Sequence, residues 1–174
     1  AILHHLGFSG DDSAAALHDF NGVKRRQEIK GVVDDITVID DFAHHPTAVR
    51  ETLKALRQAY AHNRLIAVFE PRTNTSRRSF FQQEYISSFL SADLSLVREP
   101  DPARTSDEHD RFSSARLADD LRDKKKQALA FSDTDQILAH LKDTARPGDV
   151  IVILSNGGFD NIHERLLELL RARA

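Results

Sequence analysis

Apolar residues follow two spacings along the chain, one typical of buried strands and the other typical of amphipathic helices. Strands are predicted at 24–30, 32–39, 65–69, 94–97, 128–131 and 150–154. Helices are predicted at 1–20 in two pieces, 46–60, 80–89, 113–122, 133–145 and 162–170. Strands and helices therefore alternate over most of the chain.

Turn signals separate these elements. Gly31 and the Asp34–Asp35 pair supply turn chemistry between and within the first two strands. Asp40–Asp41 should lie at the carboxyl end of the second strand, and Pro46 follows where a helix tolerates proline in its first turn. Two prolines and five acidic residues predict an exposed loop at 98–111.

Strands that alternate with helices of this length are typical of crossover units. Such units build a mostly parallel sheet with helices on both faces. We therefore expect one α/β domain over residues 1–174, with a three-layer, Rossmann-like architecture. The sequence shows no internal repeat, no low-complexity tract and no convincing linker.

Composition narrows the class of protein. The 174 residues include 24 Lys and Arg against 27 Asp and Glu, and this balance argues against a nucleic-acid binder that relies on bulk electrostatics. No apolar run approaches the roughly 20 residues that span a bilayer, and no secretory signal opens the chain. The absence of Cys fits a reducing compartment, and we expect a cytoplasmic protein. Met is also absent, including at position 1, so we expect a piece of a longer protein.

Three polar loops follow apolar strands, and this is where ligands bind in parallel α/β sheets. The loops comprise residues 40–46, 70–78 and 155–158. Because the carboxyl ends of parallel strands meet at one edge of the sheet, we expect the three loops to form one polar site.

Two carboxylates and two imidazoles stand in the first loop, just before a predicted helix. A carboxylate there can accept both hydroxyls of a ribose, and a helix amino end beside a histidine can face a phosphate. Asp and His are also good ligands for a divalent metal. In a third interpretation, one aspartate only caps the helix and the histidines are solvated. The residues alone leave all three open.

The other two loops contain groups that bind anions. Arg72 and two further arginines stand among hydroxyl and amide side chains in the second loop, and guanidinium groups grip carboxylates or phosphates bidentately. Gly157 and Gly158 free backbone N–H groups at the start of a helix. Each loop also has a purely structural interpretation, as a solvated basic loop or a strand-to-helix turn. The charged cluster at 24–28 also has two interpretations, as an exposed strand with alternating charges or as a ligand contact.

Several phosphate-binding and nucleophile motifs are absent from the sequence. It contains no G-x-x-x-x-G-K-[ST], no G-x-G-x-x-G and no G-x-S-x-G. An enzyme that uses ATP would need its main phosphate cradle elsewhere, so this chain offers a partial site.

Four segments together resemble the carboxyl-terminal domain of the Mur ligases. They are F-N-G-V-K-R-R-Q-E at 20–28, D-D-F-A-H-H-P-T at 40–47, E-P-R-T-N-T at 70–75 and S-N-G-G-F at 155–159. Within the family, they are most similar to the member that joins UDP-N-acetylmuramate to the recycled tripeptide L-alanyl-γ-D-glutamyl-meso-diaminopimelate. The D-N-P-R signature, by which another member grips free diaminopimelate, is absent.

The resemblance implies an ATP- and Mg²⁺-dependent ligase that forms an amide bond through an acyl phosphate. The UDP-sugar site belongs to the family's amino-terminal domain, and the phosphate loop with the metal ligands belongs to its central domain. Those two domains are the expected partners of this one, and we expect it to bind neither nucleic acid nor a membrane. The third domain closes over ATP and supplies the site for the incoming peptide. We therefore expect the isolated domain to be inactive.

Matched position by position, the resemblance also implies binding residues. Toward ATP it implies that Arg26 contacts the nucleotide, Asp41 accepts a ribose hydroxyl and His44 lies near the phosphates. The positions that face the incoming peptide are Arg72, Asn74, Thr75, Asn156 and Gly157, with Arg72 as a carboxylate clamp. It implies no catalytic residue and no metal ligand within this domain alone.

Three alternatives stay open. The family member that adds L-alanine to UDP-N-acetylmuramate has similar motifs, although the segments at 70–75 and 155–159 argue against it. A metal-dependent phosphohydrolase would use Asp40, Asp41, His44 and His45, but the sequence identifies no further ligands. A binding module without a catalytic role is the third alternative.

Overall fold

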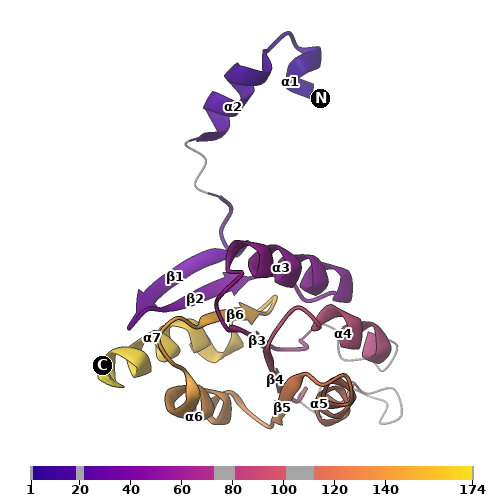
Figure 1. Ribbon diagram of the computed structural model, residues 1–174, viewed down its shortest axis with the longest axis vertical. Helices are drawn as coiled ribbons and strands as arrows, with labels where there is room; N and C mark the ends of the chain where they lie inside the picture. Colours follow the sequence, from indigo (N-terminus) through magenta and orange to yellow (C-terminus); the bar gives the residue numbers. More distant parts are fainter. Residues whose placement is uncertain (1, 19–21, 73–80, 101–111, 174) are drawn as a thin grey trace.

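The computed structural model describes residues 2–18, 22–72, 81–100 and 112–173. It has an α/β body and an amino-terminal arm of two helices, α1 (Ile2–His5) and α2 (Gly10–His18). Figure 1 shows this arm standing away from the body. None of the helices in the described part of the chain has the length and apolar character needed to cross a membrane.

One six-stranded sheet forms the centre of the body, in the order β1-β2-β6-β3-β4-β5. The strands are β1 (Glu28–Val33), β2 (Ile36–Asp41), β3 (Leu65–Phe69), β4 (Leu94–Arg98), β5 (Gln127–Phe131) and β6 (Val150–Leu154). β1 and β2 form an antiparallel hairpin, and the other neighbouring pairs are parallel. Every residue of β3 and β6 is buried, as expected for central strands covered on both faces.

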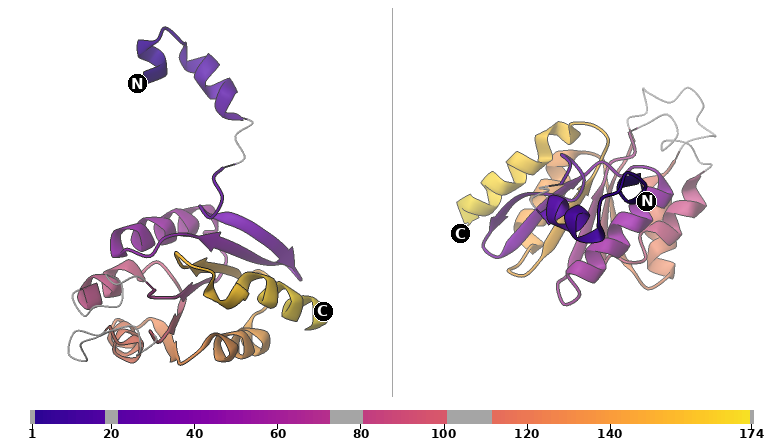
Figure 2. Two further views of the ribbon diagram at one scale, coloured as in Figure 1. Left: turned by 180° about the vertical axis from the view of Figure 1, so that it is seen from behind. Right: turned by 90° about the horizontal axis from the view of Figure 1, so that it is seen from above.

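Helices cover both faces of the sheet (Figure 2). They are α3 (Pro46–Ala59), α4 (Gln82–Ser88) and α5 (Ser114–Asp123) over one face, and α6 (Thr134–Thr144) and α7 (Ile162–Arg173) over the other. Phe69, Tyr85 and Phe89 are fully buried in the first core layer, and Phe159 is fully buried in the second. The predicted three-layer α/β class is therefore confirmed.

The strand predicted at 24–30 is wrong over its first half. Lys24–Gln27 forms turns in which Arg25 and Gln27 have positive φ values of 58° and 50°. Contacts with distant residues hold this backbone, because the Gln27 N–H donates to Asp41 Oδ2 at 2.9 Å and the Phe42 N–H donates to the Arg25 carbonyl at 2.8 Å.

The strand break predicted at Gly31 is also wrong, because Gly31 lies inside β1. A Cβ on Gly31 would lie 3.0 Å from Leu167 Cδ2 of α7, so the glycine lets the helix pack closely on the strand. The hairpin instead turns at Asp34–Asp35, where both residues have positive φ, as the turns that join antiparallel strands require.

Candidate functional site

β2, β6 and β3 are neighbours and end at the same edge of the sheet, here called the carboxyl edge. Leu154 at the end of β6 pairs with Asp41 on one side and Phe69 on the other. Beyond the strands, the Ser155 N–H donates to the Asp41 carbonyl and the Glu70 N–H donates to the Leu154 carbonyl, both at 3.1 Å. The predicted meeting of the three loops is confirmed for their described parts.

Arg25 connects the first loop to the third. Its Nε donates to Asp40 Oδ2 at 3.2 Å, and its Nη2 donates to the carbonyls of Ser155 at 2.6 Å and Gly157 at 2.8 Å. The sequence analysis selected the neighbouring Arg26 and missed this role. Arg25 has a positive φ, and the pattern of residues around it gives no sign of this conformation.

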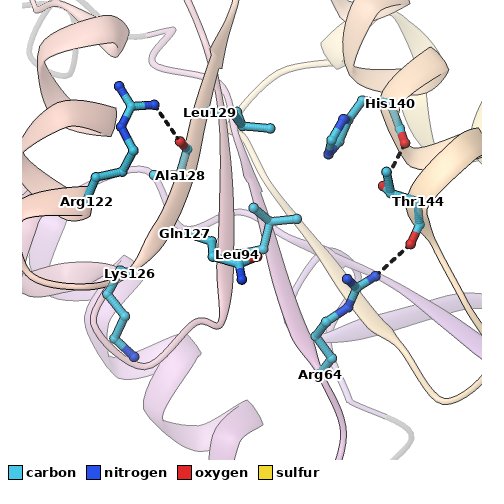
Figure 3. Close-up of a pocket in the computed structure, with 9 residues that line it drawn as sticks. All are labelled: Arg64, Leu94, Arg122, Lys126, Gln127, Ala128, Leu129, His140 and Thr144. Atoms are coloured by element: carbon cyan, nitrogen blue, oxygen red, sulfur yellow. Dashed lines mark hydrogen bonds between the residues drawn. The ribbon is translucent and has the colours of Figure 1, made fainter.

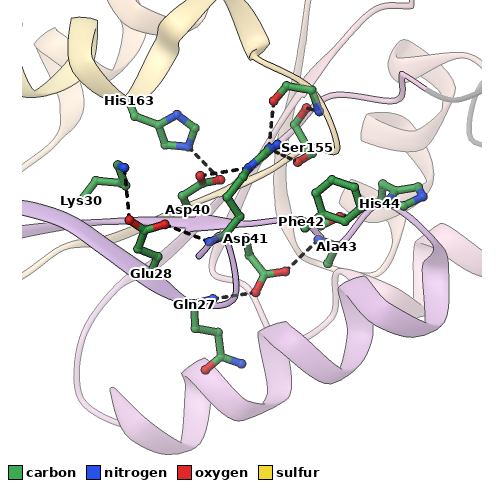
Figure 4. Close-up of polar contacts among 12 residues, drawn as sticks. Gln27, Glu28, Lys30, Asp40, Asp41, Phe42, Ala43, His44, Ser155 and His163 are labelled. Atoms are coloured by element: carbon green, nitrogen blue, oxygen red, sulfur yellow. Dashed lines mark hydrogen bonds and ion pairs between the residues drawn. The ribbon is translucent and has the colours of Figure 1, made fainter. Parts of the chain in front are cut away.

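His163 of α7 lies on the other side of the same carboxylate (Figure 4). Its Nε2 is 3.2 Å from Asp40 Oδ1, and both residues are buried. Burial alone would raise the pKa of Asp40, but the contact with His163 and the charges of His163 and Arg25 together hold it below its usual value. The Asp40 carboxylate is therefore shared by the Arg25 guanidinium and the His163 imidazole, which come from separate parts of the chain.

Replacing Asp40 by asparagine should remove a component of stability that depends on pH. Because the pKa of Asp40 is lower in the folded chain, its contribution is fully present above the unfolded value of 3.8 and is lost as pH falls toward the folded value. We expect Asp40→Asn to lower the free energy of unfolding by about 1 kcal/mol at pH 7. Urea denaturation at pH 7 and pH 3 checks this, and a difference that does not shrink at pH 3 would contradict it.

Asp41 holds the backbone around it. Its Oδ2 accepts from the Gln27 N–H at 2.9 Å, and its Oδ1 accepts from the Ala43 N–H at 2.8 Å (Figure 4). Its Oδ1 also accepts from Thr52 Oγ1 at 3.3 Å. Only 2% of Asp41 is exposed. The predicted role toward a ribose stays a prediction, and the structure adds a role in shaping the first loop.

Glu70 connects the second loop to the third. Its Oε2 accepts from Ser155 Oγ at 2.6 Å, and its Oε1 accepts from Arg98 Nη1 at 3.0 Å. Ser155 Oγ also accepts from the Gly157 N–H at 3.0 Å. These polar contacts fix the backbone of residues 155–157, and they occupy the Gly157 N–H, which the sequence analysis had assigned with that of Gly158 to a possible anion seat.

A left-handed turn follows the third loop. Phe159, Asp160 and Asn161 have φ values of 42°, 51° and 54°, which non-glycine residues seldom adopt. The Asp160 carboxylate accepts from Thr134 Oγ1 at 2.7 Å and pairs with Arg98 at 2.9 Å. Tertiary contacts therefore hold the turn that leads the third loop into α7.

Arg72 lies directly against the third loop. A Cβ placed on Gly157 would lie 2.3 Å from Arg72 Nη1 and 2.5 Å from Arg72 Cζ, so only glycine leaves room for the guanidinium there. This contact joins two residues that the sequence analysis placed in one substrate site.

The remaining predicted residues lie around the same edge or outside the described residues. Arg26 is exposed, with its guanidinium 5.7 Å from the centre of the Phe42 ring. His44 is half-buried, and its Nδ1 is 2.9 Å from the Phe42 carbonyl. Asn156 is half-buried, and its Oδ1 is a buried atom that has no hydrogen-bond partner among the described residues. Asn74 and Thr75 lie outside the described residues.

The structure gives the metal and capping interpretations of the first loop no support. Asp40 and Asp41 have the partners given above, and in the ranges that the structure describes no three His, Asp or Glu side chains gather as metal ligands. The cap of α3 is His45, which makes no side-chain capping hydrogen bond, and Pro46 opens the helix as predicted. The edge offers the guanidinium groups of Arg26 and Arg72 and the imidazole of His44, which suit it to binding anions.

Comparison with known proteins gives a consistent result. The family model described as "Mur ligase, glutamate ligase domain" matches residues 25–157. The UDP-N-acetylmuramate--L-alanyl-gamma-D-glutamyl-meso-2,6-diaminoheptandioate ligase of Escherichia coli K12 is 37% identical over 175 residues, which are 100% of this chain and 36% of that protein. The UDP-N-acetylmuramate--L-alanine ligase of Caldanaerobacter subterraneus is 34% identical over 168 residues, which are 97% of this chain and 36% of that protein.

A solved structure is similar over nearly the same range. The crystal structure of a murein peptide ligase from Psychrobacter arcticus matches with a TM-score of 0.74 and 38% identity. The match covers 97% of this chain and 34% of that one. The chain thus spans about a third of the length of the relatives it matches.

Proposed function

The chain belongs to the Mur ligase family, and from this premise we propose that it is the carboxyl-terminal domain of a ligase that joins UDP-N-acetylmuramate to L-alanyl-γ-D-glutamyl-meso-diaminopimelate. The observation that carries the proposal is the contact of Arg72 with Gly157 at the carboxyl edge, where the family's incoming substrate is expected. The identity of 37% along the whole chain to the Escherichia coli ligase supports this choice of substrate.

The proposed reaction forms an amide in two steps. The carboxylate of UDP-N-acetylmuramate attacks the γ-phosphorus of ATP, which gives an acyl phosphate and ADP. The amino group of the tripeptide then attacks the acyl carbon, and inorganic phosphate leaves. Mg²⁺ would balance the charge of the phosphates, and we propose that its ligands lie in the part of the protein outside this chain.

This domain would act by positioning the reactants. Arg26 and His44 border the first loop and would face the nucleotide, while the Asp41 carboxylate holds the loop backbone in place. Arg72 would grip a carboxylate of the tripeptide bidentately, beside Asn156 and Gly157. Asn74 and Thr75 remain predicted contacts to the same peptide.

The amino-terminal arm carries exposed apolar side chains that could contact another domain of the protein. Ile2, Leu6 and Phe8 expose 78%, 65% and 51% of their surface. A short helical segment with this much exposed apolar surface is expected to pack on a neighbour. We propose that the arm packs on the preceding domain, and the family model, which begins at residue 25, does not include it.

A ligase that adds L-alanine to the same nucleotide sugar is the second candidate. It is favoured by the identity of 34% to the Caldanaerobacter enzyme, which is close to the value for the tripeptide ligase. Turnover of the full-length protein with L-alanine and with the tripeptide distinguishes the two. A higher kcat/KM for L-alanine would overturn the proposed acceptor while leaving the ligase reaction intact.

The isolated chain should show no ligase activity. With ATP, Mg²⁺, UDP-N-acetylmuramate and the tripeptide, we expect the full-length protein to release ADP and the chain of 174 residues to release none, because the phosphate cradle lies elsewhere. A coupled assay for ADP checks this, with heat-treated chain as the blank. Measurable turnover by the chain alone would contradict the proposal.

A further inference from the structure

A pocket lies near the amino ends of β4 and β5, and Figure 3 shows the residues that line it. It has a volume of about 460 Å³, within the range of pockets that bind small molecules. Its lining comes from the amino ends of β4 and β5, from α5 and α6 and the turn after α5, and from the residue before β3. Leu94 and Gln127 are the first residues of their strands, whereas the carboxyl edge lies beyond the last ones.

The lining is basic. Arg64, Arg122 and Lys126 line the pocket together with His140, and none of the described residues that line it carries a carboxylate. Burial, followed by the charge of Arg64, lowers the pKa of His140, so this imidazole is mostly neutral at pH 7. The positive charge at the pocket therefore comes from three side chains on three different segments.

Two of these cations are partly neutralised, and one is not. Arg64 donates Nε and Nη2 to Asp149, and Arg122 Nη2 pairs with Asp119. Lys126 Nζ donates to the Ala92 carbonyl at 3.3 Å, and within the described residues it has no ion pair. The charge on Lys126 is therefore available to a ligand.

The floor of the pocket is apolar and lies along an open strand edge. Leu94, Ala128 and Leu129 supply the apolar surface, and among the described strands β5 pairs with β4 alone, which leaves its other edge open. The Ala128 carbonyl accepts a hydrogen bond from Arg122 Nη1 at 3.2 Å, so this carbonyl points away from β4 and toward the open edge of β5. Ladder geometry then directs the Ala128 N–H to the same side.

We propose that this pocket binds a small organic anion, with its apolar body on Leu94 and Leu129 and its phosphate or carboxylate beside Lys126. The unpaired charge of Lys126, beside the partly neutralised Arg64 and Arg122, favours negative charge, and the apolar floor favours a ligand larger than an inorganic ion. The site lies at the far end of the sheet from Arg72 and Gly157, and it does not depend on the proposed ligase reaction.

Phenyl phosphate is the test ligand, with inorganic phosphate and benzyl alcohol as probes that each lack one half of it. We expect titration of the ¹⁵N-labelled chain to shift the amide signals of Ala128, Leu129 and His140 with millimolar affinity. Either partial probe should bind at least fivefold more weakly than phenyl phosphate. Shifts confined to the carboxyl edge, or no shift up to about 10 mM, would overturn the proposal.

Two lysines in the same turn provide matched variants. Lys126 lines the pocket, whereas the exposed Lys124 does not, so Lys126→Gln and Lys124→Gln remove the same charge from neighbouring positions. We expect Lys126→Gln to weaken phenyl phosphate binding by roughly fivefold or more and Lys124→Gln to weaken it less than twofold. Equal weakening by both would show nonspecific attraction and overturn the proposal. Thermal unfolding confirms that both variants fold.

Discussion

Replacing Arg25 by methionine should destabilise the chain by about 2 kcal/mol, because the buried Asp40 carboxylate loses its guanidinium partner and keeps only the contact with His163. The guanidinium also donates to the carbonyls of Ser155 and Gly157. Since the Arg25 side chain is 32% exposed, this value lies below the 3–5 kcal/mol typical of fully buried pairs. The midpoint of thermal unfolding should fall by roughly 4–8 °C.

Arg26→Met is the matched control for this change. The Arg26 side chain is exposed and lies over the Phe42 ring at 5.7 Å, so its loss should cost less than about 1 kcal/mol. In the full-length ligase, we expect Arg26→Met to raise the KM for ATP. Two variants with equal losses of stability would contradict the role assigned to Arg25.

Replacing Gly157 by alanine should lower kcat/KM for the tripeptide about 100-fold in the full-length ligase, with little change in folding. The new Cβ would occupy the position of the Arg72 guanidinium, 2.3 Å from Nη1, so the side chain must move away. A bidentate contact with a carboxylate would then be lost, which is worth about 3 kcal/mol. Arg72→Ala should therefore show the same loss, and the double variant should lose little more.

Gly158→Ala is the control for this experiment. A Cβ at Gly158 would meet no atom within 4 Å, and its φ of −78° suits alanine. We expect kcat/KM for the tripeptide to stay within about twofold of the unmodified ligase. If Gly157→Ala also keeps its activity, Arg72 does not bind the acceptor from this position.

The central part of the fold could be predicted from the sequence because it depends on local patterns. β3 and β6 are continuous apolar runs bounded by polar residues, and both were predicted at the observed residues, Leu65–Phe69 and Val150–Leu154. Their parallel arrangement also placed the three polar loops at one edge, which the register of Leu154 with Asp41 and Phe69 confirms.

The errors came from contacts between distant parts of the chain. The glycine at position 31 was interpreted as a turn residue, but its role is to leave room for Leu167. Leu167 lies 136 residues further along the chain, so local sequence patterns cannot reveal this contact. Arg25 and Arg26 are chemically identical in the sequence. Only the hydrogen bonds to Asp40, Ser155 and Gly157 reveal which of the two faces inward.

The pocket beside β5 was not predicted for a similar reason. Its lining brings Arg64 together with Arg122, Lys126 and His140. The sequence analysis assigned no role to the lysines at 124–126, and no motif relates them to Arg64. Only the order of the strands brings the start of β3 near the start of β5.

The position of β6 has a consequence for biosynthesis. β6 is made after the other five strands of this sheet, yet it lies between β2 and β3 in the middle of it. Until residues 150–154 emerge, the nascent chain can form only the β1–β2 hairpin and a separate β3–β4–β5 unit, each with an unpaired inner edge. Such edges pair readily with other chains. Synthesis that stops before residues 150–154 emerge would therefore leave an aggregation-prone product.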